Sequence, residues 1–401
     1  MPKRELVFAI DLGSFSIKSA VGQIIPNLPL QIIAKEETPS IGIRRGDVIE
    51  VDEVAKRLQE NLEGLMEKVD REGSYGVAYG GVHFSFLESK GVVAVSRADG
   101  EITEEDKERA IEAGKTVSLP SNKEILETIV KGFSVDKETG IKNPVGMTGV
   151  RLEAELFLIL VSAPYFKNLK KCLEKSQVEV SDFYLSGLAA EKALLSRKDK
   201  EAGCLLLDIG AQTTKICVFE EGELSLVSVL PLGSFLITND IAIAFQIPLE
   251  IAEKLKVKYA FLSQGEVSKK EEINLKEVGG EDIKIKKKTL IEVVEARVEE
   301  ILEEVLKVLK KTQKTHLPGG VILCGGGALL PGIEKEVKKR LKLPARIGYP
   351  QNIEGIVEID NPAWATVFGI LLSEKEKKEK GVTPLPEFFS KIKKWFRNLL
   401  P

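Results

Sequence analysis

The chain has 401 residues, 43% of them hydrophobic and 30% charged. It is longer than one hydrophobic core usually supports, so we expect two domains or one subdivided domain. Lys and Arg number 58 against 61 acidic residues, a near balance that gives no general reason to expect nucleic-acid binding, and only two histidines occur, which argues against histidine triads and histidine metal sites.

The first predicted strand, Leu6 to Ile10, runs into a loop whose residues suit phosphate binding. Residues 1–5 are charged and lead directly into this strand, so we expect no signal peptide. The loop reads Asp11-Leu12-Gly13-Ser14-Phe15-Ser16-Ile17-Lys18 and precedes a second strand at 19–24. Its glycine permits a tight turn, its serines offer hydroxyls and amides to phosphate, and its Asp can hold hydrated Mg²⁺. Taken alone, the loop fits an ordinary turn about equally well.

The rest of the first half combines this unit with an insertion. An amphipathic helix is predicted from Val51 to Val69. Residues 81–154 form a compact insertion with a helix of its own, ahead of which Thr103 and Asp106 show the pattern of a capping box. A buried strand at 157–161 and helices at 166–176 and 185–195 then close the first lobe.

The phosphate-loop pattern recurs nearly two hundred residues later. The strand Cys204 to Leu207 runs into Asp208-Ile209-Gly210-Ala211-Gln212-Thr213-Thr214-Lys215, and a second strand follows at 216–219. In both copies a strand ends in Asp-apolar-Gly, hydroxyl residues follow, and a Lys closes the turn. Two facing β-hairpins of this kind, each with one Asp, can clamp the phosphates and metal of one nucleotide between two similar domains.

The second lobe continues with helices and a glycine-rich turn. Residues 234–286 read as mostly helical, with an exposed Lys- and Glu-rich segment at 268–288, and a long helix follows from Thr289 to Lys311. A strand at 321–323 then enters Cys324-Gly325-Gly326-Gly327-Ala328, where successive glycines permit close approach of a flat ligand such as adenine or ribose. A flexible strand-to-helix turn is the plainer interpretation. A last helix at 362–372 returns to the first lobe.

The final sixteen residues, 386–401, have the pattern of an amphipathic helix lying in a membrane interface. The stripe is too short to cross a bilayer, which needs about 20 apolar residues. A run of seven charged residues, 374–380, precedes it and reads as a solvated linker, although a C-terminal helix packed onto the body remains the alternative. The apolar face consists of Phe388, Phe389, Ile392, Trp395, Phe396, Leu399 and Leu400, and the cationic residues beside or opposite it are Lys391, Lys393, Lys394 and Arg397.

The order of phosphate loop, inserted domain, second phosphate loop and glycine turn resembles the actin, Hsp70 and sugar-kinase ATPase superfamily. Within it the chain is similar end to end to the FtsA family of bacterial cell-division proteins. The most specific stretches lie outside the nucleotide loops, at 91–94, 101–106, 141–153 and 238–242, and the terminal amphipathic helix is a further family feature.

This resemblance implies an α/β actin-like ATPase fold of two lobes with RNase H-like cores and a nucleotide cleft between them. Subdomain 1A would comprise 1–80, 155–202 and 355–372; 1C would be 81–154; 2A would be 203–233 and 287–354; and 2B would be 234–286. Residues 373–385 would form a flexible linker and 386–401 the membrane-targeting helix.

The resemblance also implies ATP and Mg²⁺ as ligands. The nucleotide-binding residues would be Asp11, Gly13, Ser14, Phe15, Ser16, Lys18, Asp208, Gly210, Ala211, Gln212, Thr213, Lys215, Glu253, Lys256, Gly325, Gly326, Gly327 and Ala328. Asp11 and Asp208 would hold the metal through water. Glu253 and Lys256, three residues apart on one helical face, match an acidic and basic pair over the adenosine, although a solvated salt bridge explains them nearly as well.

By the same resemblance, the chain would polymerise into filaments and tether FtsZ filaments to the cytoplasmic face of the membrane at the division site. The C-terminal peptide of FtsZ would bind subdomain 2B, and other division proteins would meet 1C. A PilM-like scaffold of pilus assembly and a small-molecule kinase remain alternatives, but a kinase needs a catalytic carboxylate and an acceptor pocket that the sequence does not indicate.

Two departures from the superfamily pattern put efficient ATP hydrolysis in doubt. Ala211 and Gln212 stand where many members have glycines, which narrows the room for a terminal phosphate or adds a hydrogen-bond donor. Ser186 and Gly187 stand where a Glu-Pro pair commonly orients the catalytic water, and Glu191, further along the same helix, points elsewhere. The catalytic residue is therefore unknown.

Overall fold

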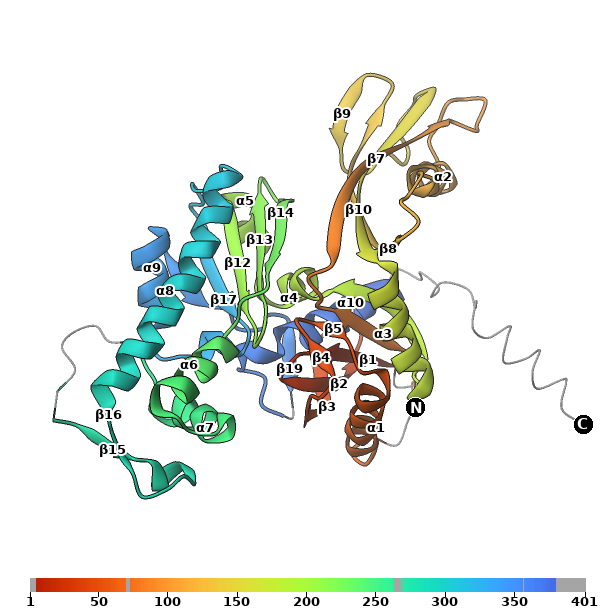
Figure 1. Ribbon diagram of the computed structural model, residues 1–401. Helices are drawn as coiled ribbons and strands as arrows, with labels where there is room; N and C mark the ends of the chain where they lie inside the picture. Colours follow the sequence, from red (N-terminus) through yellow and green to blue (C-terminus); the bar gives the residue numbers. More distant parts are fainter. Residues whose placement is uncertain (1–4, 70–72, 263–267, 269, 356, 380–401) are drawn as a thin grey trace, which may run out of the picture.

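The computed structural model describes residues 5–69, 73–262, 268, 270–355 and 357–379. Two lobes, each built on its own sheet, stand side by side, and a smaller sheet with one helix projects from the first lobe (Figure 1). The predicted amphipathic helix at 386–401 lies outside the described residues.

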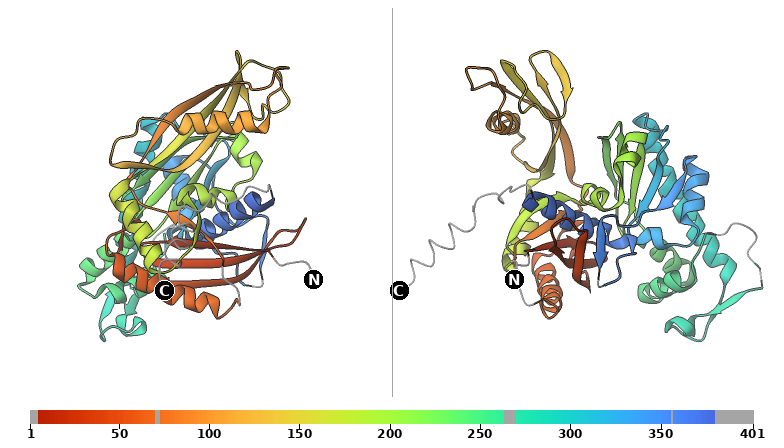
Figure 2. Two further views of the ribbon diagram at one scale, coloured as in Figure 1. Left: turned by 90° about the vertical axis from the view of Figure 1, so that its right-hand side faces the viewer. Right: turned by 180° about the vertical axis from the view of Figure 1, so that it is seen from behind.

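The first lobe is a six-stranded sheet covered by helices on both faces. The strand order is β11-β6-β1-β2-β3-β19, and the strands are β1 (Glu5–Leu12), β2 (Ser16–Ile24), β3 (Leu30–Pro39), β6 (Tyr75–Tyr79), β11 (Val180–Leu185) and β19 (Ile353–Gly355). Helices α1 (Val51–Met66) and α3 (Ala163–Lys175) pack on one face, and α4 (Ser186–Leu194) and α10 (Ala365–Glu379) on the other (Figure 2). A short hairpin of β4 (Ile43–Arg44) and β5 (Asp47–Val48) lies beside the sheet.

The insertion has its own sheet and its own small core. Its sheet has the order β7-β10-β8-β9, with β7 (Phe84–Ala94), β8 (Lys123–Val135), β9 (Glu138–Ile141) and β10 (Arg151–Ser162), and it packs against α2 (Glu104–Lys115). The predicted capping box is confirmed: the Asp106 amide donates to Thr103 Oγ1, and the Thr103 amide donates to the Asp106 carboxylate. Burial alone would raise the pKa of Asp106, but hydrogen bonds from Ser96 and Thr103 lower it to about 2.

Strand β10 corrects the predicted boundary between insertion and lobe. It runs unbroken across residues 154 and 155, and its last residues, including Ile159 and Val161, are buried in the core of the first lobe. The insertion is therefore tied to the lobe through continuous strands, because the same β10 also carries Leu152 and Leu156 into the core under α2.

The second lobe repeats the sheet-and-helix plan. The strand order is β14-β13-β12-β17-β18, and the strands are β12 (Cys204–Ile209), β13 (Thr214–Glu220), β14 (Glu223–Leu230), β17 (Gly320–Cys324) and β18 (Ala345–Ile347). Its helices include α5 (Arg197–Ala202), α8 (Lys287–Lys311) and α9 (Ile333–Leu341), with short 3-10 turns η2 (Gly326–Leu329) and η3 (Pro362–Trp364) beside the sheet edge. Helix α8 confirms the predicted long helix, and its apolar side chains from Ile291 to Leu309 are buried at helical spacing.

A subdomain of α6 (Phe235–Phe245), α7 (Leu249–Tyr259), β15 (Glu272–Asn274), η1 (Leu275–Val278) and β16 (Lys284–Lys286) extends the second lobe. Most described residues of the segment 268–288 are exposed, as expected, but a few apolar side chains are not. Strands β15 and β16 pair, and Ile273 and Ile285 are buried, because alternating apolar residues in this charged segment meet the core of the lobe.

Two predicted boundaries near the C-terminal end are also wrong. Ile353 and Glu354, predicted in the second lobe, already pair with β3 of the first. The predicted linker at 373–385 is helical up to Glu379, since α10 continues and buries Glu374, whose carboxylate accepts a hydrogen bond from the Tyr184 hydroxyl. The charged run is thus partly anchored rather than solvated.

No single helix in the described ranges is long and apolar enough to span a membrane. Helices α6 and α7 together have the required length and composition, but they are bent by 111° at the break between them. The four cysteines are buried and free.

Candidate functional site

The two predicted phosphate loops are the turns of two matching hairpins. In β1–β2, Asp11 lies opposite Lys18, and in β12–β13, Asp208 lies opposite Lys215. Each turn depends on its glycine, since a Cβ on Gly13 would lie 2.8 Å from the carbonyl oxygen of Ser16, and one on Gly210 would lie 3.0 Å from that of Thr213. The sequence duplication is therefore a duplication of backbone geometry.

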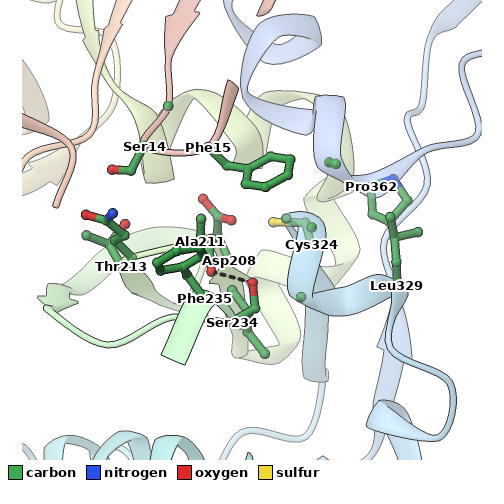
Figure 3. A pocket seen from close by; sticks show the side chains of 18 of the residues that line it. Ser14, Phe15, Asp208, Ala211, Thr213, Ser234, Phe235, Cys324, Leu329 and Pro362 are labelled. Carbon is green, nitrogen blue, oxygen red and sulfur yellow. Dashed lines mark hydrogen bonds between the residues drawn. The ribbon is translucent and has the colours of Figure 1, made fainter. Parts of the chain in front are cut away.

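One cavity of about 380 Å³ between the lobes brings the two turns together. In Figure 3, Ser14 and Phe15 of the first lobe face Ala211, Thr213 and Asp208 of the second across this space. Every residue predicted to bind nucleotide lines the cavity except Ala328, which is buried in the core of the second lobe behind the glycine turn.

The charges of the second hairpin are paired within the cavity wall. Lys215 Nζ lies 2.7 Å from Asp208 Oδ2, and both side chains are nearly buried. Burial opposes the charge of Lys215, but the neighbouring carboxylates of Asp208 and Asp11 outweigh it and raise the pKa of the amine. The amine of Lys215 is therefore charged, and it lines the cavity.

The first hairpin pairs its charges differently. Lys18 Nζ donates to Ser16 Oγ at 2.8 Å and lies 3.2 Å from Glu37, while the Ser16 hydroxyl donates to Glu37 at 2.6 Å. Burial raises the pKa of Asp11, and the nearby cations Lys215 and Lys18 offset this only in part. The partly buried Asp11 carboxyl group would therefore gain from a positive ligand.

A divalent cation would find two carboxylates here. Among the described residues, no group of three or more His, Cys, Asp or Glu side chains is placed to hold a metal ion. Mg²⁺ commonly keeps most of its waters and takes one or two carboxylates together with phosphate oxygens. Asp11 and Asp208, which both line the cavity, fit that requirement.

The predicted acidic and basic pair of α7 also lines the cavity. Lys256 Nζ lies 2.7 Å from Glu253 Oε2 and donates to Thr238 Oγ1 of α6 at 2.9 Å. The third contact of Lys256, at 3.4 Å, is with the carbonyl oxygen of Ser234. Because three partners fix the amine, the pair is an organised part of the cavity wall and differs from a solvated salt bridge.

The three successive glycines have separate roles. A Cβ on Gly325, whose φ is +81°, would lie 2.3 Å from Asp208 Oδ1, so this glycine lets the turn pack against the second phosphate loop. A Cβ on Gly326 would meet nothing within 4 Å. The prediction of close ligand approach therefore applies chiefly to Gly326, which faces open space.

The two departures from the superfamily pattern have visible consequences. Gln212 Oε1 accepts a hydrogen bond from the backbone amide of Arg45 at 2.8 Å, which joins the second phosphate loop to the first lobe. Ser186 is buried, and Glu191 pairs with Lys200 at 3.0 Å; neither lines the cavity. The helix that often carries a catalytic carboxylate thus offers none at this site.

The cavity also has lining residues that the sequence reading missed. These include Glu37, Gly46, Gly80, Ser234, Phe235, Asn361, Pro362 and Thr366. Asn361 caps the turn that leads into α10, accepting from the Ala363 amide at 2.9 Å, so the Asn-Pro sequence was an available signal. Gly46 and Gly80 carried no such signal, because close packing between distant segments brings them to the site.

Comparison with known proteins gives two family matches along this chain. Residues 205–369 match the family described as cell division protein FtsA, and residues 81–160 match the SHS2 domain inserted in FtsA. A relative described as cell division protein FtsA, from Borreliella burgdorferi, is 32% identical over 408 residues, which cover 98% of this chain and 98% of the relative.

Solved structures with similar folds are much more distant in sequence. The PilM–PilN type IV pilus biogenesis complex contains a chain of TM-score 0.65 and 16% identity, covering 92% of this chain and 98% of its own. MreB5 of Spiroplasma citri bound to AMPPNP has a TM-score of 0.57 and 13% identity, covering 96% and 100%. These likenesses confirm the predicted actin-like fold.

Proposed function

This chain belongs to the FtsA family of cell division proteins, and on that premise we propose that it is an ATP-controlled filament that attaches FtsZ to the membrane. The observation that carries the proposal is the cavity between the lobes, which is lined by both hairpin turns, by α7 and by the glycine turn. The phosphates of ATP suit the two hairpin turns, and its ribose and base suit α7 and the glycine turn.

The phosphates of ATP would lie between the two hairpin turns. There the backbone amides and hydroxyls of Ser14 and Thr213 would serve as donors, and Lys215 would supply positive charge. Asp11 and Asp208 would hold hydrated Mg²⁺, which when bound neutralises phosphate charge. Adenosine would then lie toward Glu253, Lys256 and Gly326. A similar fold, MreB5, is described as bound to AMPPNP.

Binding would act mainly by closing the lobes. Because the donors come from both lobes, a phosphate chain between them stabilises the closed form over any open one. The absence of a carboxylate from α4 at the cavity supports slow turnover, since Glu191 is committed to Lys200. ATP would thus serve as a ligand that favours filament assembly.

The C-terminal helix would attach the ATP-dependent filament to the membrane. Each exposed Lys or Arg contributes about 1 kcal/mol of attraction to an anionic surface, so one short helix binds only moderately. A filament presents many such helices on one surface, and avidity then makes attachment persistent. The site of action would be the cytoplasmic face of the membrane where the cell divides.

The C-terminal peptide of FtsZ would bind on α6 and α7. Ile243 is 75% exposed and Leu249 is 47% exposed, and both lie on the subdomain that the family resemblance assigns to this peptide. Exposed apolar side chains at adjacent helix ends are typical of peptide docking sites. The projecting insertion would meet other division proteins.

The alternative is a scaffold of pilus assembly, supported by the likeness in fold to the PilM–PilN complex. Such a scaffold would reach the membrane through a protein partner and would need no lipid-binding helix. Removal of residues 380–401 separates the two functions. The cut follows Glu379 because α10 packs on the first lobe up to that residue.

The proposal is tested by co-sedimentation with anionic lipid vesicles, with and without ATP and FtsZ. Changing Trp395 and Phe396 together to Glu should abolish sedimentation of the chain and of FtsZ while ATP binding persists, since only the apolar stripe is altered. A matched control places the same two charges at Val92 and Val150, which are 45% and 77% exposed on the insertion, and should still sediment. Sedimentation of the Trp395 and Phe396 variant would refute the tether.

A further inference from the structure

Helix α10 changes character after Ser373. From Ala365 to Ser373 every residue is buried against the first lobe. The terminal segment of α10, residues 374–379, reads Glu-Lys-Glu-Lys-Lys-Glu, contains no apolar residue, and is at least partly exposed at every position except Glu374. A helical segment that buries so little apolar surface opens at lower cost than the rest of its helix. The terminal segment can therefore open while the remainder of α10 stays in place.

The side chain of Tyr184, on β11, joins two residues of the terminal segment. Its hydroxyl donates to the Glu374 carboxylate and accepts from Lys377 Nζ at 2.7 Å. Lys377 also pairs with Asp182, two residues before Tyr184 on the same strand. Tyr184 and Glu374 are both buried, so the hydrogen bond between them lies away from water, and its loss would leave a buried carboxylate without that donor.

Other contacts of the terminal segment lie at the surface. Glu376 lies 3.3 Å from Lys192, and the two side chains are 47% and 39% exposed. Lys378 Nζ donates to the carbonyl oxygen of Leu6 at 2.8 Å, also in an exposed position. Exposed contacts of this kind contribute little, because water and salt screen them. The attachment of the terminal segment therefore depends mainly on Tyr184 and its two partners.

A further acid lies near the same lysine, where β8 of the insertion meets the first lobe. Glu127 of β8 accepts a hydrogen bond from the Leu185 amide of β11 at 3.1 Å. Burial raises the pKa of this partly buried carboxyl group to about 7; the Leu185 amide and Lys377 oppose the shift, and Asp182 adds to it. Lys377 thus attracts acids of both β11 and β8, which places the terminal segment against the first lobe and the base of the insertion.

We propose that Tyr184 and Lys377 form a reversible clasp on the terminal segment of α10, and that this clasp sets the length of the tether to the membrane. The clasp stands on the contacts above, whereas its role in tethering rests on the proposed membrane attachment. With the clasp closed, the tether begins after Glu379. With the clasp open, it begins after Ser373, and six extended residues add up to about 20 Å to its reach.

The test is hydrogen exchange of the full-length chain, measured at the backbone amides of α10. In the wild-type chain, the amides of 374–379 should exchange faster than those of 365–373. Tyr184→Phe removes the shared hydroxyl and keeps the ring, so protection of 374–379 should fall about tenfold, as expected for loss of a hydrogen bond to a charged group. Protection of 365–373 should stay within about twofold, which separates opening of the clasp from unfolding of the lobe.

Three further variants keep the inference open to refutation. Lys377→Met should also lower the protection of 374–379, whereas Lys377→Arg, which keeps the charge and the donors, should retain most of it. Lys192→Met is the matched control, because it removes an exposed contact with Glu376 of the same segment, and it should change exchange by less than about twofold. The clasp is overturned if wild-type exchange is uniform along α10, if Tyr184→Phe leaves it unchanged, or if Lys192→Met has the same effect.

The tether role has its own measurement on anionic lipid vesicles. A dye attached through Val150→Cys, at a position 77% exposed on the insertion, reports the distance from the body to a lipid dye by energy transfer. Adding Tyr184→Phe should lower the transfer, because the longer tether lets the body stand further from the lipid. Unchanged transfer would overturn the tether role. If the wild-type chain does not bind the vesicles, the proposed membrane attachment fails, and the exchange result alone decides the clasp.

Discussion

The two phosphate hairpins share a backbone but differ in how they use their charges. In the second, Asp208 and Lys215 pair directly at 2.7 Å, whereas in the first Lys18 turns to Ser16 and Glu37. In the described part of the chain, Asp11 makes no ion pair, and burial raises its pKa. The two copies of the motif thus differ in their charge pairing: Asp208 pairs with Lys215, whereas Asp11 has no ion-pair partner among the described residues.

Breaking the paired hairpin should have the largest effect. Lys215→Met leaves the buried Asp208 carboxylate without its cation, which typically costs about 3–5 kcal/mol in the free energy of unfolding. Urea unfolding of the isolated chain, followed by circular dichroism, measures this loss. A destabilisation under about 1 kcal/mol would show that Lys215 is not the central cation.

Neutralising the two aspartates should have opposite effects. Asp11→Asn should stabilise the ligand-free chain by on the order of 1 kcal/mol at neutral pH, because it removes a costly buried charge. Asp208→Asn should destabilise it, because Lys215 loses its partner. Thermal melting of both variants checks the contrast, and the same sign for both would contradict the division of roles.

The pH dependence follows from the direction of the Asp11 shift. Its pKa in the folded chain lies above the ordinary value of 3.8, so its favourable contribution is complete below pH 3.8 and is lost as pH rises through the folded pKa. The stability gain of Asp11→Asn should therefore grow from acid to neutral pH. A gain that is constant across this range would mean that Asp11 does not titrate as described.

Removing the cation of the first hairpin should have the smallest effect. Lys18→Met breaks contacts with Ser16 and with Glu37, which is about 43% exposed, and such partly solvated pairs contribute about 1 kcal/mol or less. The measurement is the same urea unfolding. A loss as large as that of Lys215→Met would mean that the two hairpins are electrostatically equivalent.

Much of this site was predictable because local sequence patterns determine it. The Asp-apolar-Gly repeat at strand ends predicted both hairpins, and the seven-residue spacing of Asp11 and Lys18 matches that of Asp208 and Lys215, which places each pair opposite across its turn. The three-residue spacing of Glu253 and Lys256 predicted that both side chains lie on one face of α7. Short-range geometry decides all three.

What the sequence did not reveal depends on contacts between distant segments. Gly46 reaches the cavity only because it packs against Gly80. The charged end of α10 looked solvated, yet Lys377 donates to the hydroxyl of Tyr184 at 2.7 Å, and Glu374 accepts from the same hydroxyl. The periodicity of the sequence carries no information about a contact with a residue almost two hundred positions away.

We propose that both hairpins clamp one Mg²⁺-ATP. Titration calorimetry of the full-length wild-type chain with ATP, in the presence of Mg²⁺ and then of a chelator, tests it most directly. The account predicts one ATP per chain, with binding weakened by the chelator and by Asp11→Asn. Failure to bind ATP at millimolar concentration, or binding that ignores both Mg²⁺ and Asp11, would contradict it.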